Sequence, residues 1–136
     1  IEAKAFGADA ILLIAAILSP QKILSFSKTA KSLGLDVLLE VHNLNELEKS
    51  IMSSIDLIGV NNRNLKTFKV SLETSRSLAD KIPAEFVKVS ESGISEVASI
   101  KKLKALGYQG FLVGENFMKT DNPGLAAKNF INQLDV

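Results

Sequence analysis

The chain has 136 residues, of which 46% are apolar and 23% are charged, and sixteen basic and fifteen acidic residues give a formal net charge of +1. This composition is typical of a globular domain and excludes a disordered chain. No basic block predicts a nucleic-acid partner, and no apolar run is long enough to predict a membrane span. The lack of cysteine excludes a disulfide framework, a thiolate metal site and a cysteine nucleophile, and it fits a cytoplasmic protein.

The first residues predict that the sequence is a piece of a longer chain. It starts with Ile1 rather than Met, and Ile1–Gly7 has the pattern of the end of a helix closed by a C-cap glycine. No signal or transit peptide pattern accounts for such a start. We therefore expect these residues to belong to a larger unit.

Five short apolar runs, rich in β-branched residues, predict five strands. They cover Ala10–Ile14, Val37–Val41, Leu57–Val60, Phe86–Val89 and Gly110–Val113. Because the runs are continuous rather than alternating, each strand is expected to be covered on both faces, as in a parallel sheet.

Segments with helical periodicity separate these runs. Helices are predicted after Ser19-Pro20, at a capping box of Asn45 and Glu48, from Ser71 to Leu78, after Ser95 as an N-cap and after Pro123. Strand and helix therefore alternate five times. With right-handed crossovers, such a chain forms either an open doubly wound sheet or part of a (β/α)8 barrel.

Polar residues and glycines follow four of the five predicted strands. Glu40 ends the second strand, residues 61–64 follow the third, residues 90–93 the fourth and residues 114–116 the fifth. Ligands of parallel α/β proteins bind at the carboxyl ends of the strands. The sequence therefore predicts a functional face at that end of the sheet.

The charged residues on this face each have a structural alternative. Glu40 could be a buried carboxylate paired with Arg63, but a charge at the end of so apolar a strand is costly unless it is paired or used, which favours a functional role. Arg63 is the side chain best suited to bind a carboxylate or phosphate group in bidentate fashion. His42 is expected to be a solvated or capping residue rather than a base.

Glycines after the last two predicted strands indicate a phosphate site. Ser92-Gly93 and Gly114 would let backbone N–H groups approach an anion without obstruction by side chains. Glu115 would have to point away from that anion and offer only its N–H group. The sequence contains no Gly-x-Gly-x-x-Gly motif and no P-loop, so a dinucleotide or nucleoside triphosphate site is not predicted.

Two of the strand ends carry specific motifs, Asn61–Leu65 and Ser90–Ile94. Three further segments accompany them in a fixed order along the chain: Ala8–Ile14, Leu39–His42 and Phe111–Glu115. Together these segments resemble the indole-3-glycerol phosphate synthase family, the (β/α)8-barrel carboxy-lyases of tryptophan biosynthesis. The resemblance implies an α/β fold in which residues 1–136 form the C-terminal part of a single barrel domain. The chain would supply strands four to eight, with strands one to three absent.

The resemblance also implies site residues. Glu40 would be a catalytic carboxylate, and Asn61 would assist it. Substrate contacts would come from Arg63, Glu91, Ser92, Leu12 and Leu13, the two leucines lying near the aromatic ring. Phosphate contacts would come from Ser92, Gly93, Gly114 and Glu115.

The implied reaction converts 1-(2-carboxyphenylamino)-1-deoxyribulose 5-phosphate to indole-3-glycerol phosphate, CO₂ and water, and needs no metal or organic cofactor. In the family, the acid is a lysine on strand three, aided by residues on strands one and two. We therefore expect the chain alone to be inactive and to need, as its partner, the missing N-terminal segment or another copy of itself.

Two other interpretations stay open at this point. One is a different sugar-phosphate barrel enzyme, such as phosphoribosylanthranilate isomerase. The other is a half-barrel that binds phosphate without catalysis. In each case a five-stranded arc has two unpaired edges, which predicts oligomerisation or aggregation of the chain alone.

Overall fold

The computed structural model describes residues 1–134, which contain five strands and seven helices. The elements are α1 (Glu2–Ala5), β1 (Ala10–Ile14), α2 (Pro20–Ser32), β2 (Asp36–Val41), α3 (Leu44–Ser50), β3 (Leu57–Asn61), α4 (Glu73–Leu78), β4 (Val87–Glu91), α5 (Val97–Ala105), β5 (Gly110–Leu112), α6 (Glu115–Met118) and α7 (Pro123–Asn132). Each predicted strand is present, with its ends displaced by two residues at most.

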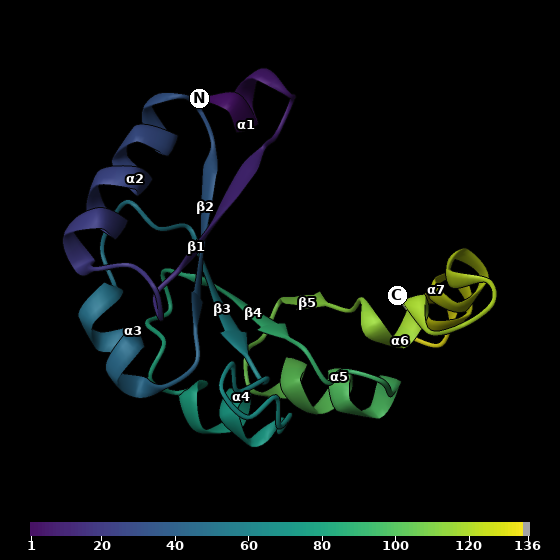
Figure 1. The fold of residues 1–136 in the computed structure, drawn as a ribbon. Coiled ribbons are helices and arrows are strands. Elements are labelled where there is room, and N and C mark those ends of the chain that lie inside the picture. Colours follow the sequence, from purple (N-terminus) through teal and green to yellow (C-terminus); the bar gives the residue numbers. More distant parts are fainter. Residues whose placement is uncertain (135–136) are drawn as a thin grey trace.

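The five strands form one parallel sheet in the order β1-β2-β3-β4-β5 (Figure 1). The helices α2, α3, α4 and α5 lie along its convex side, and no helix of residues 1–134 covers the concave side. A doubly wound sheet would need helices on both faces and a reversal of strand order. The chain therefore has the architecture of five consecutive units of a (β/α)8 barrel, as the sequence predicts.

The core lies between the sheet and the helices on the convex side. Val37, Leu39 and Val41 of β2 are fully buried there together with Ile58 and Val60 of β3. Side chains alternate along a strand, so the residues between these five point to the concave side. Each buried aliphatic side chain contributes roughly 1.5–3 kcal/mol, which makes this layer the main source of the fold's stability.

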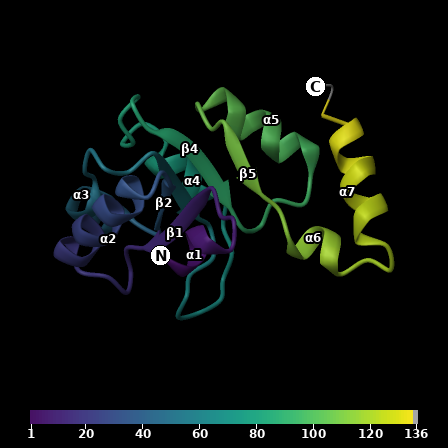
Figure 2. The same cartoon turned by 90° about the horizontal axis from the view of Figure 1, so that it is seen from above.

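The last two helices, α6 and α7, lie beyond the end of β5 (Figures 1 and 2), and Phe130 of α7 packs against the hydrophobic core. Phe117 of α6 and Phe130 of α7 pack edge to face, with 5.5 Å between ring centroids. Asn122 caps α7, since its side-chain oxygen accepts a hydrogen bond from Leu125 N at 3.0 Å.

Helix ends agree with the sequence at two places. Ser19 caps α2, accepting a hydrogen bond from Lys22 N at 3.3 Å, with Pro20 in the first helical position. Gly7 follows α1 with a φ of +86°, a left-handed conformation that glycine adopts without strain.

Three predicted helix starts are displaced. The capping box of α3 consists of Asn43 and Glu46 rather than the next Asn-x-x-Glu pattern, because the helix begins directly after β2. Ser71 precedes α4 by two residues and accepts a hydrogen bond from Glu73 N at 3.3 Å. Ser95 is not a cap, because α5 begins only at Val97.

Candidate functional site

The register of the sheet brings the predicted carboxylates together on its concave side. Ile14, Glu40 and Gly59 occupy one row across β1, β2 and β3. Asn61 and Glu91 are partners in the next row, at the carboxyl ends of β3 and β4. Two acidic side chains and an amide thus converge at the end of the sheet where the sequence predicts a functional face.

Glu40 is held by two neighbours. Its side chain is only 8% exposed, and its Oε1 accepts a hydrogen bond from Asn61 Nδ2 at 3.1 Å. The Nε2 atom of His42 lies 3.2 Å from the same oxygen, although the ring does not align an N–H group with it. Asn61 in turn accepts a hydrogen bond from Arg63 N at 2.9 Å through its side-chain oxygen. Asn61 therefore couples the catalytic candidate Glu40 to the loop that carries Arg63.

The sequence predicts a solvated or capping role for His42, and the structure excludes the first of these two roles. Its side chain is 11% exposed, and its Nδ1 lies 3.2 Å from Glu46 Oε2. The same oxygen accepts a hydrogen bond from His42 N at 2.9 Å. The ring thus lies between Glu46 in the first turn of α3 and Glu40 near the end of β2.

Glu91 lies over a glycine on the neighbouring strand. A Cβ atom on Gly59 would come within 1.9 Å of Glu91 Oε1, so the carboxyl group occupies the space that a side chain at Gly59 would fill. Glu91 is 6% exposed, and Oε1 has no hydrogen-bond partner among the described residues. Burial, together with the adjacent Glu40, raises the pKa of Glu91 to about 7. Glu91 is therefore suited to hold a proton near neutral pH.

The turn after β4 has an unusual backbone. Ser92 has a φ of +66° and Gly93 a φ of +73°, so two successive residues are left-handed. A Cβ atom on Gly93 would lie 2.3 Å from Val70 Cγ1, so only glycine fits there. A left-handed serine persists only where its surroundings hold it, and such residues cluster at ligand sites.

Arg63 and the predicted phosphate residues share one hollow. Loops after β3, β4 and β5 line it, and the residues from the sequence prediction found there are Arg63, Glu91, Ser92, Gly93, Gly114 and Glu115. Lys119 also lines the hollow, and no sequence pattern had indicated this residue.

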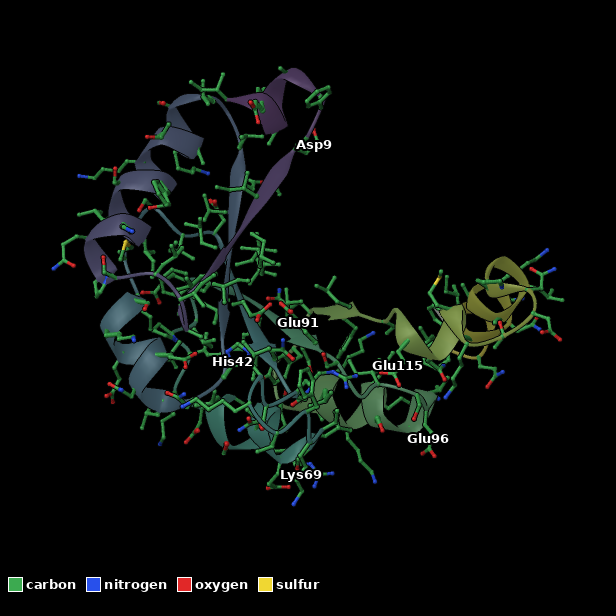
Figure 3. The ribbon with its side chains drawn as sticks, in the orientation of Figure 1. Asp9, His42, Lys69, Glu91, Glu96 and Glu115 are labelled. Atoms are coloured by element: carbon green, nitrogen blue, oxygen red, sulfur yellow. The ribbon has the colours of Figure 1, made fainter. Side chains whose placement is uncertain are left out.

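The sequence interpretation required the Glu115 side chain to point away from this hollow, and the structure contradicts it. Its carboxylate forms an ion pair with the guanidinium of Arg63, and Figure 3 shows Glu115 at the start of α6. Arg63 is therefore paired with Glu115 and not with Glu40, the pairing that the structural alternative for Glu40 assumed.

The two predicted leucines do not share a face. Leu12 is 49% exposed on the concave side, while Leu13 is buried on the convex side in the core. Successive side chains of a strand point in opposite directions, so the Leu13 side chain does not reach the concave side on which Leu12 lies. Ile14, two residues after Leu12, lies beside Glu40 on the concave side. The alternation of side chains along a strand would have indicated Ile14, rather than Leu13, as the second apolar residue of the pocket.

The structure has two further features that bear on ligands and partners. Within residues 1–134, no helix combines the length and apolar character needed to cross a bilayer. No three His, Cys, Asp or Glu side chains of those residues are grouped as metal ligands.

Comparison with known proteins adds sequence relatives to this geometry. The family model for indole-3-glycerol phosphate synthase matches residues 1–130. Indole-3-glycerol phosphate synthase of Bacteroides thetaiotaomicron is 50% identical over 133 residues, which cover 98% of this chain and 51% of that protein. The synthase of Koribacter versatilis is 45% identical over 131 residues, or 96% of this chain and 50% of that protein. The chain thus matches about half the length of either relative.

Among solved structures, a chain in the crystal structure of the Amycolatopsis orientalis BexX/CysO complex superposes with a TM-score of 0.55. The alignment covers 86% of this chain and 51% of that chain, at 15% sequence identity. At this identity the likeness concerns the fold alone.

Proposed function

Because the chain belongs to the indole-3-glycerol phosphate synthase family, we propose that residues 1–136 form the C-terminal part of a single (β/α)8 barrel. The barrel converts 1-(2-carboxyphenylamino)-1-deoxyribulose 5-phosphate to indole-3-glycerol phosphate, CO₂ and water, a step of tryptophan biosynthesis. The observation that carries the proposal is the convergence of Glu40, Asn61 and Glu91 beside the hollow that contains Arg63.

The reaction asks for proton transfer in both directions, which the carboxyl pair can support. The ring carbon that bears the carboxylate attacks the ribulose carbonyl carbon, and the carbonyl oxygen takes up a proton. Loss of CO₂ returns the bonding pair to the ring, and the new hydroxyl group then leaves as water while a neighbouring carbon loses a proton. In this proposal Glu40 accepts a proton and Glu91 holds one near neutral pH.

Substrate binding is assigned to three regions of the concave side. The aromatic ring lies against apolar side chains of β1 that include Leu12, and Asn61 and Arg63 orient its carboxylate. The phosphate group lies at the loops after β4 and β5, near Ser92-Gly93 and Gly114. Until an anion arrives, Glu115 neutralises Arg63.

The electrons of this reaction balance within the substrate, so the proposal invokes no metal or organic cofactor. The family's lysine acid is expected on strand three, and its helpers on strands one and two. The chain therefore needs a partner for activity, either three further β/α units or another copy that closes the sheet. We assign the protein to the cytoplasm, on the biosynthetic role of the family and the lack of cysteine.

The test uses an intact barrel, meaning this chain joined to the part of the Bacteroides thetaiotaomicron relative that it does not match. Glu40→Gln is expected to lower kcat about 100-fold, since it removes a proton acceptor at the reacting atoms. Glu48→Gln, an exposed carboxylate on α3, is the matched control and is expected to change kcat by less than about twofold.

The outcomes separate the interpretations. A Glu40→Gln barrel that keeps its rate within about tenfold would remove Glu40 from the chemistry. A wild-type barrel that binds inorganic phosphate but turns over no substrate would support the phosphate-binding half-barrel instead.

A further inference from the structure

Asn62 lies on the opposite side of the sheet from its neighbour Asn61. The two follow one another at the end of β3, so their side chains point to different faces. Asn61 reaches Glu40 on the concave side, while Asn62 is 2% exposed and lies in the interior. Its side chain therefore cannot touch a substrate in the hollow directly.

The amide nitrogen of Asn62 holds the end of β4 and the turn that follows. Its Nδ2 donates to Glu91 O at 2.9 Å, to Ser92 O at 3.1 Å and to Ser90 Oγ at 3.0 Å. The backbone N–H of Asn62 also donates to Glu91 O, at 2.8 Å. Asn62 thus binds the main chain of the two residues that bring a carboxyl group and a left-handed turn to the site.

The amide oxygen of Asn62 is fixed from the other side. It accepts hydrogen bonds from Ser75 N at 3.1 Å and from Ser75 Oγ at 2.9 Å, and Ser75 belongs to α4. Tyr108 OH donates to Ser75 O at 2.7 Å, which anchors that residue in turn. Because both ends of the amide are occupied, the side chain cannot rotate without loss of several buried hydrogen bonds.

The turn that Asn62 holds would not adopt its shape unaided. Ser92 is left-handed without being a glycine, and Gly93 is left-handed beside Val70. A short hydrogen-bonded clamp on the carbonyls of Glu91 and Ser92 is a sufficient reason for this backbone to persist.

We propose that Asn62 is a positioning residue for the synthase reaction: it clamps the carbonyls of Glu91 and Ser92 from the interior and so fixes the Ser92-Gly93 turn for the phosphate group. This role rests on the proposed function of the site. The clamp acts through hydrogen bonds of neutral groups, so its contribution to anion binding is expected to be independent of pH near neutrality.

The discriminating variant is Asn62→Asp in the intact barrel defined above. It keeps the size and the oxygen that faces Ser75, but it replaces the two N–H donors with an acceptor that faces three oxygens. We expect KM and the inhibition constant of inorganic phosphate to rise in parallel by about tenfold or more, with a smaller change in kcat.

Two matched controls separate the clamp from general destabilisation. Asn64→Asp makes the same chemical change at an exposed residue of the same loop, whose oxygen already accepts from Lys66 N and Thr67 N. Ser50→Ala removes a different fully buried hydroxyl group, which has no hydrogen-bond partner among the described residues and lies outside the clamp. Both are expected to change phosphate inhibition by less than about twofold.

A folded Asn62→Asp barrel with unchanged phosphate inhibition would overturn the proposal. If that variant does not fold, Asn62→Ser, which keeps one donor, decides the question, and an unchanged inhibition constant there also overturns it. If wild-type barrel shows no turnover, phosphate affinity measured by calorimetry replaces the inhibition constant. The proposed function then fails, while weaker phosphate binding by the Asn62 variants still supports the clamp.

Discussion

Glu91 is held by the fold in a state that differs from that of an exposed glutamate. Its burial and the nearby Glu40 raise its pKa from 4.5 to about 7. In the unfolded chain the group ionises near its ordinary pKa, so between about pH 4.5 and 7 the folded state binds the extra proton. The contribution of Glu91 to folding stability therefore falls as pH rises through this window. Above about pH 7 the folded state bears the full free-energy cost of burying the ionised carboxylate.

Glu91→Gln removes this ionisation while keeping the shape of the side chain. The intact barrel carrying it is expected to melt at a higher temperature than wild type at about pH 8, with the gain shrinking as pH falls toward about 5. Thermal unfolding at several pH values measures the difference, and the exposed Glu48→Gln serves as control. A gain that is the same at both ends of this range would contradict the assignment.

Gly59 in the middle of β3 shows how neighbouring strands share space. Glycine inside a strand is usually unfavourable, but here the neighbouring strand's Glu91 occupies the position of the missing side chain. A Cβ atom would also approach Leu38 Cδ1, at 3.2 Å. The glycine is therefore what allows a carboxyl group to lie flat on the concave side of the sheet.

Gly59→Ala is expected to lower kcat of the intact barrel by about tenfold or more, because Glu91 has to leave its position. Combined with Glu91→Gln, the substitution should cost less than the sum of the two single effects. Gly124→Ala in α7 is the control, since a Cβ there meets nothing closer than 3.8 Å. Equal losses from the two glycine substitutions would show that the effect of Gly59→Ala is not specific to the site.

The strands, and the gathering of polar residues at their carboxyl ends, could be predicted from the sequence because apolar runs and the residues that end them are local patterns. The capping box of α3 could not be predicted, since residues 43–48 contain two overlapping Asn-x-x-Glu patterns. The first one is used because β2 ends directly before it. The side of the sheet on which a side chain lies could not be predicted for the same reason. Which of Asn61 and Asn62 reaches the site, and that His42 turns inward, depends on where each strand ends.

The sheet as a whole is open at both sides. Within residues 1–134, β1 pairs only with β2, and β5 only with β4. Leu12 of β1 and Leu112 of β5 are each about half exposed on the concave side. Unpaired strands next to exposed apolar side chains favour association with another chain.

Expressed alone, the chain is expected to self-associate and to show no synthase activity. Sedimentation velocity measures the association, and a turnover assay measures the activity. Coexpression with the complementary part of the Bacteroides thetaiotaomicron relative is expected to yield a soluble, active complex. A monodisperse monomer that melts cooperatively would show that the open edges are tolerated.

The strand order has a consequence for how such a sheet is built. Every strand pairs with the strand that follows it in the sequence, so each pairing closes a loop of only one helix and two turns. Loop-closure entropy is small for such steps, and the sheet can grow by one unit at a time. An open edge offers its unpaired N–H and C=O groups to the next unit, so we expect a barrel of this kind to assemble also from pieces that are not joined covalently.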